Sequence, residues 1–353
     1  MARCLQKYFR HSRPLWLRKR NMRALISLKR LATFGVVASL IALSGLPAPA
    51  QAQTKLRLAV ETNSGDPLNI MLANFRDALA KSTGPEATIE FFEGGALGDE
   101  TALMELIRAG EVQVVPLGSD VVTLDKGFSV LDTPFLFADK AAARAAFDGA
   151  FGKLLATSLR QKAGLEVLAY GELGFRTIST TNKQINVPAD LKGLKIRTPG
   201  SPTRILAFKT LGAAPTPMPL GEVYMALKQG ALDGQENPLS VIKEFSFFEV
   251  QKFIALTNHV YTPITLAMNG AAFDALTPEM KAKVIEAAKA GSAATRKASD
   301  DSDARLVDEF KAKGVTVTTP DLAAFRAAAE PVKGEIAKVV GPELMGKLEA
   351  SLK

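Results

Sequence analysis

The feature that most constrains the fold of this chain is an alternation of short apolar runs with helix-like segments, which begins at residue 55. The expected strands are residues 56–60, 87–92, 112–117, 165–170, 194–197, 214–218, 233–236 and 253–256. The expected helices between them are residues 67–81, 101–109, 140–161, 202–211 and 220–229. This order of elements predicts an α/β fold, with parallel sheets and helices on both faces of each sheet.

The carboxyl-terminal third has a different pattern. Thr277 and Pro278 form an N-cap followed by Pro at the first helical position, and Gly314 is a plausible end of the same helix. About 35 residues lie between them and would span roughly 50 Å as a helix. That length suits a helix that braces two lobes, with Gly291 as its weak point. Two more helices are expected at residues 321–339 and 342–352.

The amino-terminal segment predicts export. Residues 1–52 contain ten Lys and Arg and no acidic residue, and residues 31–46 form an uncharged run that ends before a proline. Residues 50–52 (AQA) fit a small-x-small cleavage pattern, so we expect a signal peptide cleaved after Ala52. A membrane anchor is the alternative, but sixteen residues reach only about 24 Å of a ~30 Å hydrocarbon core. Met22 is the alternative start of the chain.

Removal of this segment changes the charge of the chain. The whole sequence carries a net charge of +8, whereas residues 53–353 carry 34 basic and 36 acidic residues, which is −2. They have no Cys and one His, His259. A disulfide, a thiol nucleophile and a His- or Cys-rich metal site are therefore excluded from the mature chain, and a basic stripe for nucleic acid is absent from it.

The sequence also lacks the motifs of common enzymes. We find no G-x-S-x-G, no phosphate-binding G-x-x-x-x-G-K-[ST] and no H-E-x-x-H. A hydrolase that uses carboxylates alone is not excluded by counting, but no spacing in the sequence groups the acidic residues. His259 follows an apolar strand and is expected to be structural. We therefore expect a protein without enzyme activity, cofactor or metal.

Several polar residues follow predicted strands. Arg197 ends the strand at residues 194–197, Asn237 follows the strand at 233–236, and Glu61 follows the first strand. Arg176 lies at the start or edge of a strand after a tight turn. Ligands of open α/β sheets bind beyond the carboxyl ends of the strands, and a buried guanidinium requires a planar partner such as a carboxylate. This arrangement favours the binding of an organic acid.

The same region resembles the substrate-binding subunits of TRAP transporters (the DctP type). The resemblance covers nearly all of the chain from about residue 55. It rests on residues 171–176 (GELGFR), 188–197 (PADLKGLKIR), 212–218 (GAAPTPM), 222–227 (EVYMAL), 233–238 (DGQENP) and 256–259 (LTNH), and upstream on 95–100 (GALGDE) and 134–137 (PFLF).

This resemblance implies a two-lobed periplasmic binding protein of the α/β class, with mixed, mainly parallel sheets, a long bracing helix and a ligand cleft between the lobes. Lobe 1 is expected at residues 53–174 with about 263–300, and lobe 2 at 175–262 with about 301–353. The protein is expected to be a monomer that delivers a small organic acid to a membrane permease driven by an ion gradient. The alternative is a sensor module that presents its ligand to a membrane receptor.

The resemblance also implies roles for individual residues. Arg197 corresponds to the carboxylate-binding arginine of the family, Arg176 to a second, less uniform arginine, and Asn237 to an asparagine that reaches the ligand. Leu220 and Glu61 fall on positions that often face the pocket. Because Glu61 would repel a second carboxylate unless it pairs with Arg176 or is protonated, a hydroxylated monocarboxylate such as a sugar acid is the favoured ligand. A C4-dicarboxylate is the next choice.

Overall fold

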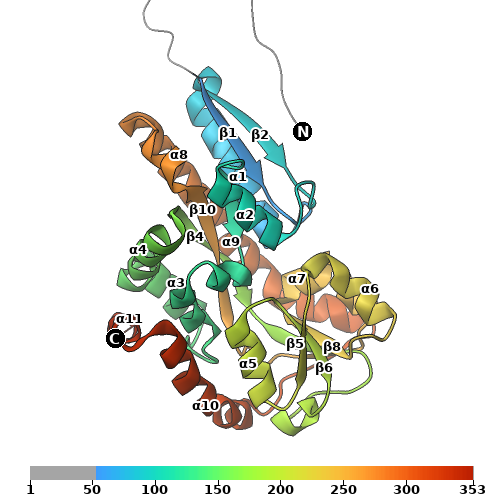
Figure 1. Cartoon of the computed structure of the whole chain (residues 1–353). Helices are drawn as coiled ribbons and strands as arrows, with labels where there is room; N and C mark the ends of the chain where they lie inside the picture. Colours follow the sequence, from blue (N-terminus) through green and yellow to red (C-terminus); the bar gives the residue numbers. More distant parts are fainter. Residues whose placement is uncertain (1–52, 353) are drawn as a thin grey trace, which may run out of the picture. The chain divides into compact units, whose positions relative to one another are not determined.

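Two mixed β-sheets form the framework of the protein (Figure 1). The structure, a computed structural model, describes residues 53–352, so the predicted signal peptide lies outside the described residues. Within them the first sheet has the strand order β2 (Ala87–Phe92), β1 (Thr54–Ala59), β3 (Val114–Leu117), β10 (Tyr261–Asn269) and β4 (Leu165–Phe175). The second has the order β11 (Thr316–Thr318), β9 (Phe253–Ala255), β5 (Thr177–Thr180), β8 (Gly234–Asn237), β6 (Lys195–Thr198) and β7 (Ala214–Pro217). Five of the nine strand pairings in this part of the chain are parallel, which confirms mixed, mainly parallel sheets.

Helices cover both faces of the first sheet. They are α1 (Pro67–Thr83), α2 (Glu100–Ala109), α3 (Lys140–Asp148), α4 (Ala150–Ala163), α8 (Gly270–Asp274), α9 (Pro278–Ala312) and α11 (Pro342–Ala350). Successive residues of a strand point to opposite faces, and β1 follows this rule. Leu58 packs in one core with α1 and the start of α9, whereas Ala59 packs in the other with α2, α4 and α11. The first sheet is therefore buried on both sides.

The second sheet is covered in the same way. Its helices are α5 (Pro202–Thr210), α6 (Val223–Lys228), α7 (Leu239–Glu244) and α10 (Leu322–Val340). Ile196 of β6 packs with Phe208 of α5 and Phe325 of α10. Ile254 of β9 packs on the opposite face with Phe310, near the end of α9. Each sheet thus has its own pair of hydrophobic cores.

Helix α9 joins the cores of the two sheets, as predicted for a bracing helix. It contains 35 residues and begins after Thr277, whose side chain accepts a hydrogen bond from the Met280 amide. Val284 near its start is buried with the first sheet, and Phe310 near its end with the second. Gly291 in its middle permits a close approach, because a Cβ there would lie 2.6 Å from the main-chain oxygen of Met71 in α1.

The chain crosses between the sheets at two adjacent points besides α9. Strand β4 ends at Phe175 and β5 begins at Thr177, so Arg176 itself is the first crossing. Residues 256–260, between β9 and β10, form the second. The Arg176 amide donates to the Val260 carbonyl oxygen at 2.8 Å, so the two crossings run side by side. This agrees with the prediction of close crossings rather than a flexible tether.

The structure differs from the sequence prediction in several places, and the short elements α7, α8 and β11 have no counterpart in it. Strand β10 is absent from the prediction because Pro263 interrupts its pattern. The structure accommodates that proline at a register shift between Thr262 and Pro263. A strand at Arg176 is expected after a tight turn, but the structure has no turn there, because β4 continues to Phe175 and β5 begins at Thr177. The helix expected at residues 140–161 is two helices, α3 and α4, which meet at Gly149.

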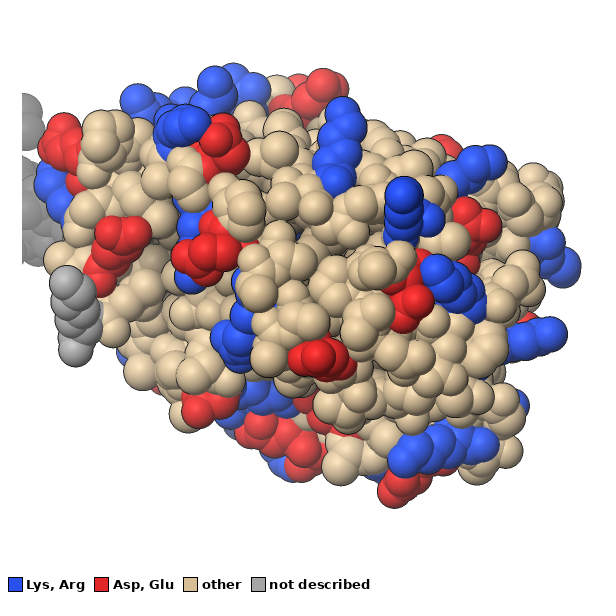
Figure 2. All heavy atoms as spheres, turned by 90° about the horizontal axis from the view of Figure 1, so that it is seen from below, with Lys and Arg blue, Asp and Glu red and all other residues tan. Residues whose placement is uncertain are grey.

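None of the helices in residues 53–352 combines the length and the apolar character that a membrane crossing requires. The face of the molecule in Figure 2 shows Lys and Arg side chains interspersed with Asp and Glu. No large patch of one sign is visible on that face.

Candidate functional site

A cavity of about 230 Å³ lies where parallel strands of both sheets end. Its lining from the first sheet and the adjoining segments includes Glu61, Asp66, Leu68, Asp99, Glu100, Gly118, Ser119, Asp120 and Leu173. Its lining from the second includes Arg176, Arg197, Pro199, Gly200, Met218, Leu220, Asn237 and Val241. All five residues predicted from the sequence, Glu61, Arg176, Arg197, Leu220 and Asn237, line this one cavity. The cavity lies at the carboxyl ends of strands, as the general rule for α/β sheets predicts.

Arg197 is a cationic side chain of this cavity that forms no ion pair within residues 53–352, although Glu236, Asp120 and Glu61 act on its charge. It lies near the end of β6 and is only 4% exposed. Its Nε and Nη2 atoms donate to the Met218 carbonyl oxygen at 2.9 and 2.7 Å. Among the described residues no carboxylate forms an ion pair with it. Burial, and secondarily the charge of Arg176, lowers its pKa to about 10, so the guanidinium remains charged near neutral pH.

Arg176, in contrast, is held by groups of the protein. Its Nε atom donates to the Glu236 carboxylate. Its Nη2 atom donates to the Glu236 carbonyl oxygen at 2.6 Å and to Asn237 Oδ1 at 2.8 Å. Glu236, not Glu61, is therefore the carboxylate that pairs with Arg176. The contact with Asn237 fixes the orientation of that amide, whose Nδ2 donates to Gln235 Oε1 at 2.6 Å.

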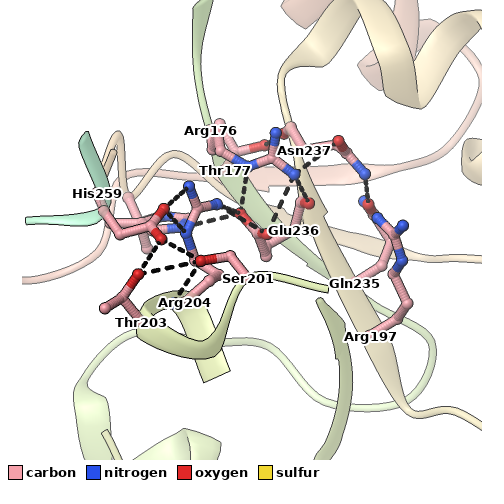
Figure 3. Close-up of polar contacts among 12 residues, drawn as sticks. Arg176, Thr177, Arg197, Ser201, Thr203, Arg204, Gln235, Glu236, Asn237 and His259 are labelled. Carbon is pink, nitrogen blue, oxygen red and sulfur yellow. Dashed lines mark hydrogen bonds and ion pairs between the residues drawn. The ribbon is translucent and has the colours of Figure 1, made fainter. Parts of the chain in front are cut away.

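Glu236 joins Arg176 to a second buried arginine, and Figure 3 shows these contacts as one connected group. Arg204 Nη1 donates to both Glu236 carboxylate oxygens at 3.0 Å, and Arg204 Nη2 donates to Asp132 Oδ1 at 2.6 Å. His259 Nε2 lies 3.2 Å from Glu236 Oε2. Two guanidinium groups thus face two carboxylates, which satisfies the charges of this buried group.

His259 takes a structural place in this group, as expected. Its Nδ1 atom lies 2.8 Å from Thr257 Oγ1, so both ring nitrogens contact protein groups. Burial lowers its pKa, although the neighbouring Glu236 raises it, so the ring is neutral at pH 7. Leu220, at the start of a short 3-10 turn, contacts the cores on both sides of the cavity.

Three carboxyl groups, Glu61, Glu100 and Asp120, form what we call the carboxyl wall. Glu61 lies two residues beyond β1, and its Oε2 accepts from the Glu100 amide at 3.0 Å. Glu100 begins α2, and its Oε1 accepts from the Gly118 amide at 2.7 Å, directly after β3. Asp120 lies in the turn that follows Gly118. Strands β1 and β3 are parallel neighbours, so their carboxyl ends bring these acids together.

The carboxyl wall holds protons more tightly than free acids do. Burial raises the pKa of Glu61 to about 7, with further increases from Asp66 and Asp120 and decreases from the Glu100 amide and Arg197. Burial also raises the pKa of Glu100 well above its usual value, and raises that of Asp120. Near pH 7 the wall is therefore partly protonated.

These raised values predict that the empty protein is more stable at pH 5 than at pH 8. Burial raises the pKa of Asp66, as of Glu61, to about 7, whereas both titrate near 4 when unfolded. Between these values the folded state binds more protons, so the free energy of unfolding falls as pH rises. We expect a loss of a few kcal/mol, measured by urea denaturation.

Asp66→Asn, which keeps the N-cap acceptor for the Leu68 amide, should flatten this dependence. A free energy of unfolding that increases from pH 5 to pH 8 in the wild-type protein would contradict the prediction.

Sequence reasoning missed Arg204, Asp132, Glu100 and Asp120. One of them had a usable pattern, because Arg204 lies three and four residues before Ala207 and Phe208 on the buried face of α5. An arginine on an apolar helix face requires a buried partner. The others come from separate elements, and no spacing relates them. Within residues 53–352 no group of His, Cys, Asp and Glu side chains is arranged to hold a metal ion.

Residues 58–338 of the chain match the family model DctP, described as bacterial extracellular solute-binding protein, family 7. The chain is 39% identical over 269 residues to the 2,3-diketo-L-gulonate-binding periplasmic protein YiaO of Escherichia coli (strain K12). That alignment covers 76% of this chain and 82% of the relative.

Two solved structures share the fold closely. One is a sugar acid binding protein from Advenella mimigardefordensis in complex with galactonate, with a TM-score of 0.80 and 31% identity, covering 85% of this chain and 98% of that one. The other is a TRAP periplasmic solute-binding protein from Roseobacter denitrificans with bound β-D-glucuronate. Its TM-score is 0.80 and its identity 32%, and the match covers 84% of this chain and 99% of that one.

Proposed function

This chain belongs to family 7 of the bacterial extracellular solute-binding proteins, the substrate-binding proteins of TRAP transporters, and on that premise we propose that it captures a small organic acid in the periplasm and delivers it to a TRAP membrane permease. The family and the relatives reported above are binding proteins rather than enzymes. The proposal includes export by the predicted signal peptide and action as a monomer.

The observation that supports this proposal most directly is the state of Arg197. Its guanidinium is buried beside a cavity, remains charged, and has no acidic partner in the described part of the chain. Such a group is costly to bury unless a ligand completes its interactions. A carboxylate accepts two parallel N–H bonds from a guanidinium, so an organic acid provides the missing charge. Asn237 lies beside it as a further hydrogen-bonding group.

We propose that the ligand has one carboxylate and several hydroxyl groups, as sugar acids and hydroxy acids do. Glu61 is not neutralised by Arg176, which pairs with Glu236 instead. The wall opposite Arg197 therefore offers carboxyl groups, which hydrogen-bond hydroxyls and repel a second carboxylate. The names of the relatives, which refer to diketogulonate, galactonate and glucuronate, support the same class. A C4-dicarboxylate is the second choice.

Binding of this kind requires contributions from both sides of the cavity. Micromolar affinity corresponds to about 8 kcal/mol, whereas a hydrogen bond to a charged group contributes about 1.5–3 kcal/mol. We propose that the two lobes, residues 53–174 with about 263–300 and residues 175–262 with about 301–353, close over the ligand. The last helix, α11, departs from this division, because it packs against α4 in a core of the first sheet and moves with the first lobe. We propose that ligand binding shifts the population toward the closed conformation. The permease can then distinguish the loaded protein from the empty one by its conformation.

Mass spectrometry of the molecule released from purified protein, combined with a thermal-shift panel, tests this function. We expect aldonates, uronates or hydroxy acids to raise the melting temperature, since a ligand at 100 times its Kd stabilises by about 2.7 kcal/mol. Succinate and malate serve as the dicarboxylate comparison. Stabilisation by succinate or malate without any effect of sugar acids would overturn the ligand class. No stabilisation by any organic acid would overturn the proposed function.

A further inference from the structure

The cavity is electrically polarised between its two sides. The side from the first sheet presents the carboxyl wall (Glu61, Glu100 and Asp120), with Asp66 adjacent to it. The side from the second presents Arg176 and Arg197. When the carboxylate of a ligand binds Arg197, the rest of that ligand extends toward the acids on the opposite side. The carboxyl wall therefore contacts the end of the ligand that is remote from Arg197.

We propose that the carboxyl wall is a charge filter: it binds hydroxyl groups at the remote end of the ligand, rejects a second carboxylate there, and takes up protons when an anionic ligand enters. This inference rests on the proposed function and names the residues of the same cavity that select its substrate. It assigns to Glu100 and Asp120, as well as to Glu61, a part in ligand selection.

The free hydrogen-bonding atoms of this side suit hydroxyl groups. Asp120 Oδ1 and Asp66 Oδ2 are buried, and neither has a hydrogen-bond partner among the described residues. The other oxygen of Asp66 accepts from the Leu68 amide at 2.8 Å, which fixes the orientation of its carboxyl group. A hydroxyl donates to an ionised carboxylate and accepts from a protonated one, so it fits either state of the wall. A ligand carboxylate fits only beside a protonated acid.

Within residues 53–352, the cations that face the wall are Arg197 and Arg176, and neither is free to neutralise a second carboxylate there. The charged groups that face Glu61 are Asp66, Asp120 and Arg197, and its nearest amide donor belongs to Glu100. The charged groups that act on Asp120 are Arg197, Asp132, Arg176 and Glu100, and Glu244 acts on Asp66. Arg197 is the anchor of the first carboxylate in the proposed function, and Glu236 neutralises Arg176. Like charges forced together in a buried site cost several kcal/mol.

The same geometry links affinity to pH. A bound anion favours the protonated form of nearby acids, so binding takes up protons wherever the empty wall is partly ionised. The pKa of Glu61, about 7, places this range at neutral pH and above. The carboxylate of an aldonate stays ionised there. Affinity should therefore fall as pH rises above 7, by up to about tenfold per pH unit for each proton taken up.

Matched acids test the filter. Gluconate and glucarate share one carbon chain and the same inner hydroxyls, and differ only in a terminal hydroxyl or carboxylate; galactonate and galactarate form a second such pair. By calorimetry at pH 7.5 we expect each dicarboxylate to bind on the order of 100-fold more weakly than its partner, which corresponds to about 2.7 kcal/mol. Titrations in phosphate and in Tris, whose ionisation enthalpies differ, measure the protons taken up.

Glu61→Gln and Glu100→Gln, singly and together, should reduce the difference in affinity between the two acids of each pair. They should also reduce the number of protons taken up on binding. Glu105→Gln is the matched control, because it removes the same charge from an exposed position on α2 and should leave both quantities unchanged. Unfolding curves at pH 8 verify that the variants fold. Equal affinity within a pair, or no proton uptake on binding, overturns the filter but leaves the proposed function intact. A dicarboxylate that binds where its partner does not also overturns it. No binding of any acid overturns both.

Discussion

Arg197→Ala should abolish ligand binding and leave the fold intact. The alanine removes a buried, charged guanidinium whose protein partner is one carbonyl oxygen, that of Met218. Two hydrogen bonds to a carboxylate contribute about 3–6 kcal/mol, so affinity should fall by about 10² to 10⁴-fold or below detection. Calorimetry with the acid identified from the purified protein measures the affinity. The melting temperature of the empty protein shows whether the fold is retained.

The lysine variant separates charge from geometry. Arg197→Lys keeps a positive charge but loses the planar pair of donors, so affinity should still fall sharply. Arg326→Ala removes an arginine from an exposed position on α10, where it lies over Phe135, and serves as the control with unchanged affinity. Wild-type affinity of the Arg197→Ala protein would show that the ligand does not bind at this guanidinium.

The location of the cavity could be predicted because it depends on local patterns. The apolar runs of the strands are visible in the sequence, and polar residues at their carboxyl ends must converge where parallel strands lie side by side. Glu61 follows such a run and Arg197 ends another, and the structure places both at the cavity. Local patterns alone do not show which strand belongs to which of the two sheets. Strand β10 pairs with β3 and β4, yet Pro263 concealed it.

The partners of the buried charges could not be predicted for a related reason. Asp132 lies in a 3-10 segment, Arg204 in α5 and Glu236 in β8, and these are brought together only by the packing of α5 between the sheet and the residues around position 132. The same applies to the carboxyl wall, where one acid comes from each of three elements. Sequence distance carries no information on such contacts, whereas the burial of Arg204 on an apolar helix face indicated that a partner must exist.

Glu236→Gln should be the most destabilising conservative change in the described part of the chain. Glu236 is fully buried and neutralises Arg176 and Arg204 together, so the amide leaves these two guanidinium groups with Asp132 alone. Removal of one partner from a buried ion pair costs about 3–5 kcal/mol. We expect the melting temperature to fall on the order of 10 °C, and urea denaturation to give the free energy. Ligand affinity should also fall, because Glu236 holds Arg176 and, through it, Asn237 at the cavity.

The effect of Glu236→Gln should be nearly constant between pH 5 and pH 8. Its two arginines and His259 hold the pKa of Glu236 far below its usual value despite the opposing effect of burial, so its contribution is present above the unfolded pKa near 4.3 and is lost only in strong acid. Glu343→Gln, which removes an exposed partner of Lys347, should change stability by less than about 0.5 kcal/mol. Adding Arg204→Met to Glu236→Gln removes the unpaired cation and should recover part of the loss. If Glu236→Gln were as mild as Glu343→Gln, the pairing of Glu236 with Arg176 and Arg204 could not be a large contribution to the stability of the fold.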